Sequence, residues 1–93
     1  MNFIYDKKKN QILFENRGLT FEQAIEIISE EEGVLLDFQH PNAELYPNQR
    51  IMVIAINHYP HCIPYVMDGT NFVLKTIFKD RRFKYLLENS NGN

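Results

Sequence analysis

Apolar residues recur at helical spacing in the first third of the chain. Four of them share one helical face at i, i+3, i+4 and i+7, namely Phe21, Ala24, Ile25 and Ile28. Thr20 stands just before them with Gln23 three residues later, which is a capping box. The pattern predicts an amphipathic helix that begins after Thr20 and buries its apolar face.

An earlier helix is predicted from Asp6 to about Glu15. Asp6 is a favourable N-cap, and Gly18 ends the helix because glycine readily adopts the left-handed conformation. In this helix the pattern places Ile12 and Leu13 in the core and leaves the lysines exposed.

Strand patterns occupy much of the remaining chain. Five stretches have strand character, namely residues 2–5, 34–38, 51–56, 62–67 and 72–78. Residues 51–56 are apolar on both faces, which predicts a central strand. Pro64 cannot donate a ladder hydrogen bond, so residues 62–67 are predicted to form an edge or bulged strand. Turns are expected at residues 57–61 and at Asp68-Gly69.

The last predicted strand alternates and then leads into a short helix. One face carries Phe72, Leu74, Thr76 and Phe78, and the other carries Val73, Lys75 and Ile77. Asp80 is the expected N-cap of a helix with a buried stripe of Phe83, Leu86 and Leu87. The order of elements predicts an α+β fold with an antiparallel sheet of about four strands and with helices on one side of it, namely two N-terminal helices and this C-terminal helix. We expect one domain over residues 1–88 and a disordered polar tail at residues 89–93.

Length and composition are those of one small folded domain. The chain has 93 residues, of which 44% are hydrophobic and 13% aromatic, so wholesale disorder is excluded. Cys62 is the single cysteine, which excludes an internal disulfide and suits a reducing compartment. No apolar run has the length of a membrane span, and lysines follow the apolar N-terminus rather than precede it. We therefore expect a cytoplasmic protein without membrane contact.

Charge is distributed unevenly, although the net charge is only −2. Residues 1–49 hold four basic and nine acidic residues, whereas residues 50–93 hold six basic and three acidic ones. Five of these bases are clustered in sequence, namely Lys75, Lys79, Arg81, Arg82 and Lys84. A lysine on the last strand beside this basic turn and helix predicts a compact site for the phosphates of a polyanion. The alternative is a solvated, charged helix end that binds nothing.

Three segments support a family resemblance through their order and spacing. They are Tyr5-Asp6-Lys7-Lys8-Lys9-Asn10, Gly18-Leu19-Thr20-Phe21-Glu22-Gln23-Ala24, and Leu74-Lys75-Thr76-Ile77 leading to Arg81. In these segments the chain resembles the BrnT-like toxins of bacterial type II toxin–antitoxin systems. The resemblance implies a RelE-like fold and a small ribonuclease that inhibits translation and is inactivated by a tightly bound, DNA-binding antitoxin. The chain departs from the family pattern at Arg17, where histidine is frequent, and in its closing turn at residues 78–83.

RNA cleavage of the implied kind needs no metal or cofactor, because the neighbouring 2′-hydroxyl of the RNA is the nucleophile. We predict that Arg81 and Arg82 stabilise the transition state, since a guanidinium matches two phosphate oxygens and stays charged. Proton transfer is assigned to Lys75, His61 or Tyr85, because arginine is a poor base. The predicted substrate contacts are Arg50, Lys79 and Lys84, and Arg50 is also a candidate third phosphate ligand.

Each catalytic candidate has a structural alternative. Lys75 is expected to be partly desolvated between Val73 and Ile77, but it can equally extend from an outward strand face into water. The Tyr85 ring can pack on the sheet with its hydroxyl exposed.

The turn residues and the apolar strands suggest two further ligands, a zinc ion and a protein partner. His58 and His61 lie beside Cys62 in the sequence, so a zinc site is an alternative. Only the distant His40 could supply a further ligand, so turn histidines without a metal are favoured. Five apolar strand residues exceed what two short helices can cover and predict a partner surface for the antitoxin, namely Tyr59, Ile63, Tyr65, Met67 and Phe72. The rival hypothesis is a non-catalytic interaction module of the same fold. A DNA-binding subunit is less favoured, because no helix-turn-helix or basic-region pattern is present.

Overall fold

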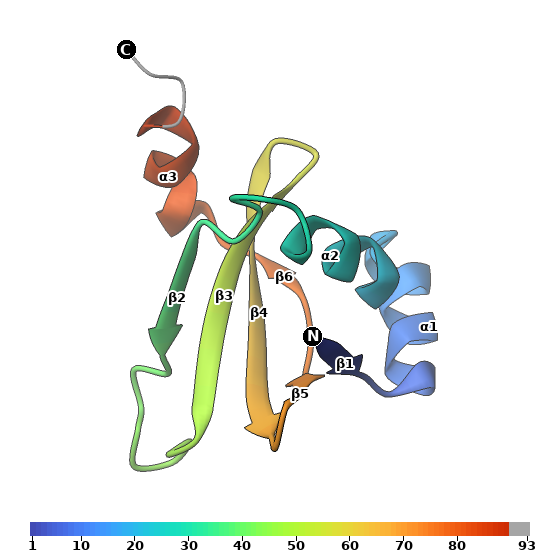
Figure 1. Ribbon diagram of the computed structural model, residues 1–93. Coiled ribbons are helices and arrows are strands. Elements are labelled where there is room, and N and C mark those ends of the chain that lie inside the picture. The colour runs from blue at the N-terminus through green and yellow to red at the C-terminus, as the bar shows by residue number, and fades with distance from the viewer. Residues whose placement is uncertain (90–93) are drawn as a thin grey trace.

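The protein is an α+β domain in which helices cover both faces of one mixed sheet. The computed structural model describes residues 1–89. Helices α1 (Lys7–Arg17) and α2 (Phe21–Ile28) cover one face, and the 3₁₀ turn η1 (Arg81–Phe83) with α3 (Lys84–Asn89) packs against the other (Figure 1). The α+β class and the three helices are confirmed, but the prediction that the helices lie on one side of the sheet is wrong.

The sheet has more strands than the expected four, and it is not wholly antiparallel. Its strands are β1 (Asn2–Ile4), β2 (Leu36–Gln39), β3 (Gln49–Ile56), β4 (Tyr59–Asp68), β5 (Asn71–Leu74) and β6 (Phe78–Lys79). The order across the sheet is β1-β5-β4-β3-β2, and the short β6 also pairs with β4. Only β1 and β5 are parallel, with Phe3 opposite Phe72.

Both N-terminal helices begin at the predicted caps, and α1 also ends at the predicted glycine. The Asp6 carboxylate accepts a hydrogen bond from the Lys9 N–H at 3.0 Å, and the Thr20 hydroxyl accepts one from the Gln23 N–H at 3.1 Å. Gly18 ends α1 with a φ of 67°, a left-handed conformation that glycine adopts without strain. Leu13 is buried as predicted, but the prediction for Ile12 is wrong, because its side chain is 46% exposed.

A polar clamp joins the two helices. Asn10 accepts a hydrogen bond from the Phe21 N–H at 2.7 Å and donates one to the Glu22 carboxylate at 2.7 Å. The Tyr5 ring stacks on Phe21 with 5.1 Å between centroids. These residues belong to the first two segments that carry the family resemblance, and their role here is to hold α1 against the start of α2.

The middle of the sheet confirms one strand prediction and corrects another. Strand β3 is central and has buried residues on both faces. Of the two alternatives predicted for β4, the edge strand is wrong, because β4 pairs with β3 on one side and with both β5 and β6 on the other. The Pro64 carbonyl accepts from the Lys75 N–H at 2.8 Å, so its ring nitrogen faces the same gap between β5 and β6. The missing donor therefore costs no ladder bond.

The predicted turn at residues 57–61 is also too long. It contains only Asn57 and His58, with φ angles of 53° and 62°, and the chain re-enters the sheet at Tyr59. Two left-handed residues in succession match the twist of a tight hairpin.

The alternation predicted for residues 72–78 is wrong because the strand breaks after Leu74. Lys75 and Thr76 lie outside the sheet, Ile77 turns into the core beside Leu74, and β6 resumes at Phe78 on the opposite face. Asp80 caps the next turn as predicted, and its carboxylate accepts from the Arg82 N–H at 3.1 Å.

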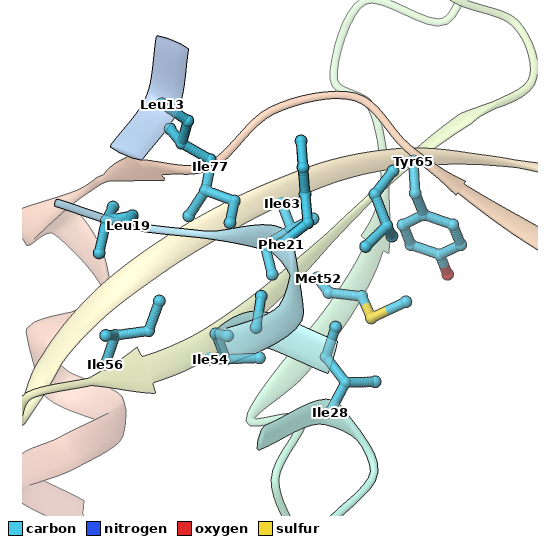
Figure 2. Packing of buried hydrophobic residues seen from close by; sticks show 12 residues of the cluster. Leu13, Leu19, Phe21, Ile28, Met52, Ile54, Ile56, Ile63, Tyr65 and Ile77 are labelled. Atoms are coloured by element: carbon cyan, nitrogen blue, oxygen red, sulfur yellow. The ribbon is translucent and has the colours of Figure 1, made fainter. Parts of the chain in front are cut away.

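The main core lies between the sheet and the two N-terminal helices. Figure 2 shows Leu13 and Phe21 from the helices meeting strand residues that include Ile54 and Ile63. Tyr65 is also buried here, so Ile63 and Tyr65 cannot belong to the exposed partner surface predicted for them. A smaller cluster on the other face includes Val53, Cys62, Phe83 and Leu86.

Two expectations concern the chain ends and the membrane. No helix in the described part of the chain is long and apolar enough to cross a membrane. Asn89 is the last residue of α3, and residues 90–93 of the expected disordered tail lie outside the described residues.

Candidate anion-binding site

Lys75 lies in a basic hollow that differs from the predicted site. The hollow has a volume of about 280 Å³ and lies between α1 and the connection from β5 to β6. It is lined by Lys9, Ile12, Leu13, Asn16, Arg17, Phe21, Lys75 and Thr76. The lining thus contains three cations, one amide, one hydroxyl and three apolar side chains, and we call this site the basic hollow.

One face of α1 supplies most of the basic hollow. Lys9, Asn16 and Arg17 lie on this face together with Ile12 and Leu13, at helical spacings of three, four, seven and eight. Sequence reasoning missed Lys9 and Arg17 as ligand candidates, although this spacing was a usable signal. The spacing alone does not locate the site, because tertiary packing determines which residues lie opposite this face of α1.

Arg17 is fixed in place by the backbone opposite it. Its Nη1 donates a hydrogen bond of 2.6 Å to the Ile77 carbonyl, and Ile77 is completely buried. A guanidinium carries five N–H donors in a planar fork, so this bond leaves others for a ligand. No side-chain ion pair within residues 1–89 involves Lys9, Arg17 or Lys75. Arg17 and Lys75 therefore have no direct ionic partner in this part of the chain, whereas the pKa of the Asp6 carboxyl is lowered by the hydrogen bond from the Lys9 N–H and, to a lesser extent, by the nearby charge of Lys9.

Arg81 and Arg82 do not line the basic hollow. The Lys75 N–H bonds to the Pro64 carbonyl, whereas the Asp80 N–H bonds to the Pro60 carbonyl, four residues away along β4. Four residues of an antiparallel strand span about 13 Å, so Lys75 and Asp80 contact β4 at points about 13 Å apart. The expected compact patch of Lys75 with both arginines is thus divided between two places, and Lys75 lies with Arg17 instead.

Arg82 is engaged in a local ion pair. Its Nη2 lies 2.6 Å from Asp80 Oδ2, and its Nε donates to both carboxylate oxygens. The hydrogen bond from Arg82 holds the pKa of Asp80 below its usual value. The same carboxylate accepts from the buried Cys62 thiol at 3.7 Å. Arg82 therefore neutralises Asp80, the N-cap of the turn to which Arg82 belongs. Arg81 is exposed.

Lys79 and Lys84 form a second basic cluster around Tyr59. The two Nζ atoms lie 5.6 and 5.7 Å from the centroid of the same ring, which is within the range of cation–π attraction. Lys79 also lines a second hollow of about 530 Å³, together with Asn16, Arg17, Leu19 and Phe78. We call this space the second hollow.

The remaining predicted residues lie elsewhere. His61 is only 2% exposed; its Nδ1 is 2.7 Å from the Tyr59 carbonyl oxygen, and burial lowers its pKa. A buried imidazole cannot contact RNA, so its predicted role in proton transfer is not supported. Tyr85 is 49% exposed, and its ring centroid is 6.4 Å from that of Phe83. Arg50 donates to Asp37 at 2.9 Å and lines neither the basic hollow nor the second hollow.

The geometry of the histidines and the cysteine bears on the zinc alternative. Among residues 1–89, no three His, Cys, Asp or Glu side chains are grouped so that they could hold a metal ion. His40 instead lies 4.4 Å from the Tyr46 ring centroid and accepts a hydrogen bond from the Asn42 N–H. No residue set for zinc is therefore identified in the described part of the chain.

Comparison with known proteins does not assign a family. A scan against models of protein families found no match, and a search of curated proteins found none either. The chemistry of the site is therefore inferred from its geometry, which is a hollow lined by three basic side chains.

Proposed function

We propose that the protein binds RNA through the basic hollow and cleaves it without a metal, as the toxin of a bacterial toxin–antitoxin pair. The observation that carries this proposal is that Lys9, Arg17 and Lys75 line one concave surface and that none of them forms a direct ion pair within residues 1–89. Within the proposal the chain is a cytoplasmic BrnT-like toxin with a RelE-like fold, and its partner is a DNA-binding antitoxin.

The proposed chemistry is transfer of a phosphodiester to the neighbouring 2′-hydroxyl. The 2′-oxygen attacks phosphorus, the bond to the 5′-oxygen breaks, and the products carry a 2′,3′-cyclic phosphate and a 5′-hydroxyl. Arg17 and Lys9 offset the charge that develops on the non-bridging oxygens. Lys75 donates a proton to the departing 5′-oxygen, and water takes the proton of the 2′-hydroxyl.

The second candidate function is RNA binding without catalysis. It is favoured by one observation, namely that the residues lining the basic hollow include no carboxylate and no imidazole that could act as a general base. Arg81 and Tyr85 are exposed and stay predicted RNA contacts in both cases.

An assay of cleavage and binding separates the two candidates. Labelled RNA is incubated with the protein in excess EDTA, and binding is measured with 2′-O-methyl RNA, which lacks the nucleophile. The test variant is R17A/K75A, and the matched control is K7A/K8A, which removes two exposed lysines of α1 outside the basic hollow. We expect cyclic-phosphate products from the wild type and the control, and a loss of about 100-fold or more in R17A/K75A.

The other outcomes are equally informative. Binding without cleavage by the wild type would favour the non-catalytic function. If R17A/K75A and K7A/K8A bind RNA equally well, the basic hollow is not the RNA-binding site in either of the two candidate functions. Growth arrest on expression in bacteria, relieved by co-expression of the neighbouring gene, tests the toxin–antitoxin assignment separately.

A further inference from the structure

We propose that Lys79 and Lys84 around Tyr59 form a second phosphate subsite, and that one single-stranded nucleic acid spans this subsite and the basic hollow with Arg17 between them. The inference rests on the proposed binding of RNA in the basic hollow and extends it to a defined path on the surface.

The first observation is the pairing of two cations on one aromatic ring. Lys79 comes from β6 and Lys84 from the first turn of α3, yet both ammonium groups lie within 5.7 Å of the Tyr59 centroid. Neither forms an ion pair with a side chain in residues 1–89. The ring attracts both ammonium groups, so two positive charges lie around the same residue. An anion that contacts both lysines interacts with two cations that have no ion-pair partner in that range, so the cluster suits a phosphate.

The second observation is the continuity of the two basic sites. Asn16 and Arg17 line both the basic hollow and the second hollow, and Lys79 also lines the second hollow. Arg17 therefore shares one hollow with Lys75 and the other with Lys79. Lys79 is in turn close to Lys84, because both ammonium groups lie near the Tyr59 ring.

This arrangement indicates a polymer rather than a mononucleotide. One nucleotide brings its phosphate to only one of the two sites, whereas a chain with a phosphate at every residue reaches both. A single strand can bend its backbone into two adjacent hollows, and such strands bind proteins through basic grooves with aromatic residues. A duplex presents its phosphates on a stiff rod and cannot follow the surface in this way.

Fluorescence anisotropy with 2′-O-methyl oligonucleotides tests the subsite, because these strands cannot be cleaved. The test variant is K79A/K84A, the charge-retaining control is K79R/K84R, and K7A/K8A removes the same charge elsewhere. We expect K79A/K84A to bind a ten-nucleotide strand about tenfold more weakly at low salt, with the log–log salt slope reduced by about 1.4. Binding of a mononucleotide should match the wild type, and K79R/K84R should retain strand binding. Circular dichroism verifies that each variant is folded.

The results separate failure of the subsite from failure of the proposed function. If K79A/K84A and K7A/K8A weaken strand binding equally while R17A/K75A weakens it more, the second subsite is wrong but the basic hollow stands. If all three double-alanine variants behave alike, both proposals are wrong. A duplex that binds as tightly as the single strand would overturn the inferred substrate class.

Discussion

Replacing Asn10 with alanine should destabilise the protein by about 1–3 kcal/mol. The Asn10 side chain accepts a 2.7 Å hydrogen bond from the Phe21 N–H, one of the first backbone donors of α2 and without a partner inside that helix. Phe21 is only 1% exposed, so water replaces this bond poorly. An unsatisfied buried donor costs about 1–3 kcal/mol. The hydrogen bond from Asn10 to Glu22 is exposed, so water can replace it when Asn10 is removed.

Chemical and thermal unfolding followed by circular dichroism measure this effect. A loss of this size should lower Tm by roughly 4–20 °C in a domain of fewer than 100 residues. Gln11→Ala is the matched control, because Gln11 is the exposed neighbour on the same helix and should change stability by less than about 0.5 kcal/mol. Asn10→Asp keeps an acceptor for Phe21 but places a carboxylate beside Glu22, so it should recover only part of the loss. If Asn10→Ala unfolds like the control, the clamp between α1 and α2 does not contribute as argued.

Three further predictions concern β4 and its hairpin. His58→Gly should stabilise the protein by about 0.5–1 kcal/mol in urea titrations, because its φ of 62° suits glycine; destabilisation would contradict this account of the turn. Burial lowers the pKa of His61, so its contribution to stability is complete above the unfolded pKa of about 6.5 and is lost as pH falls through the folded pKa. Tm should therefore fall between pH 7.5 and 5.5 in the wild type and much less in His61→Leu; parallel curves would refute this assignment. Burial raises the pKa of the Cys62 thiol to about 12, so a thiol reagent at pH 8 should react slowly with folded protein and rapidly in urea. Equal rates would show that the thiol is accessible.

Local features of this fold could be predicted from the sequence, because their causes lie within a few residues. The caps at Asp6, Thr20 and Asp80 each join a side chain to a backbone N–H two or three residues away. Gly18 ends α1 for an equally local reason. Such signals depend on short-range geometry and are independent of the fold around them.

The features that were mispredicted depend on distant partners. Pro64 indicates an edge strand when β4 is considered alone, but the gap between β5 and β6 places its missing donor where no partner is needed. Residues 72–78 alternate well enough for one strand, yet burial of Ile77 beneath α1 breaks the alternation. Tertiary packing therefore overrode a local pattern in both cases.

The same reasoning explains why sequence clustering did not locate the basic site. Arg81 and Arg82 are adjacent in the chain, but one of them is neutralised by Asp80, which the turn needs as its cap. Arg17 and Lys75 are 58 residues apart and meet only because Arg17 bonds to the Ile77 carbonyl as Ile77 enters the core. Arg17 also stabilises the last turn of α1, because a cation there interacts favourably with the helix dipole. The fold, rather than the local density of basic residues, thus determines which cations are left unpaired in a hollow and available to a phosphate.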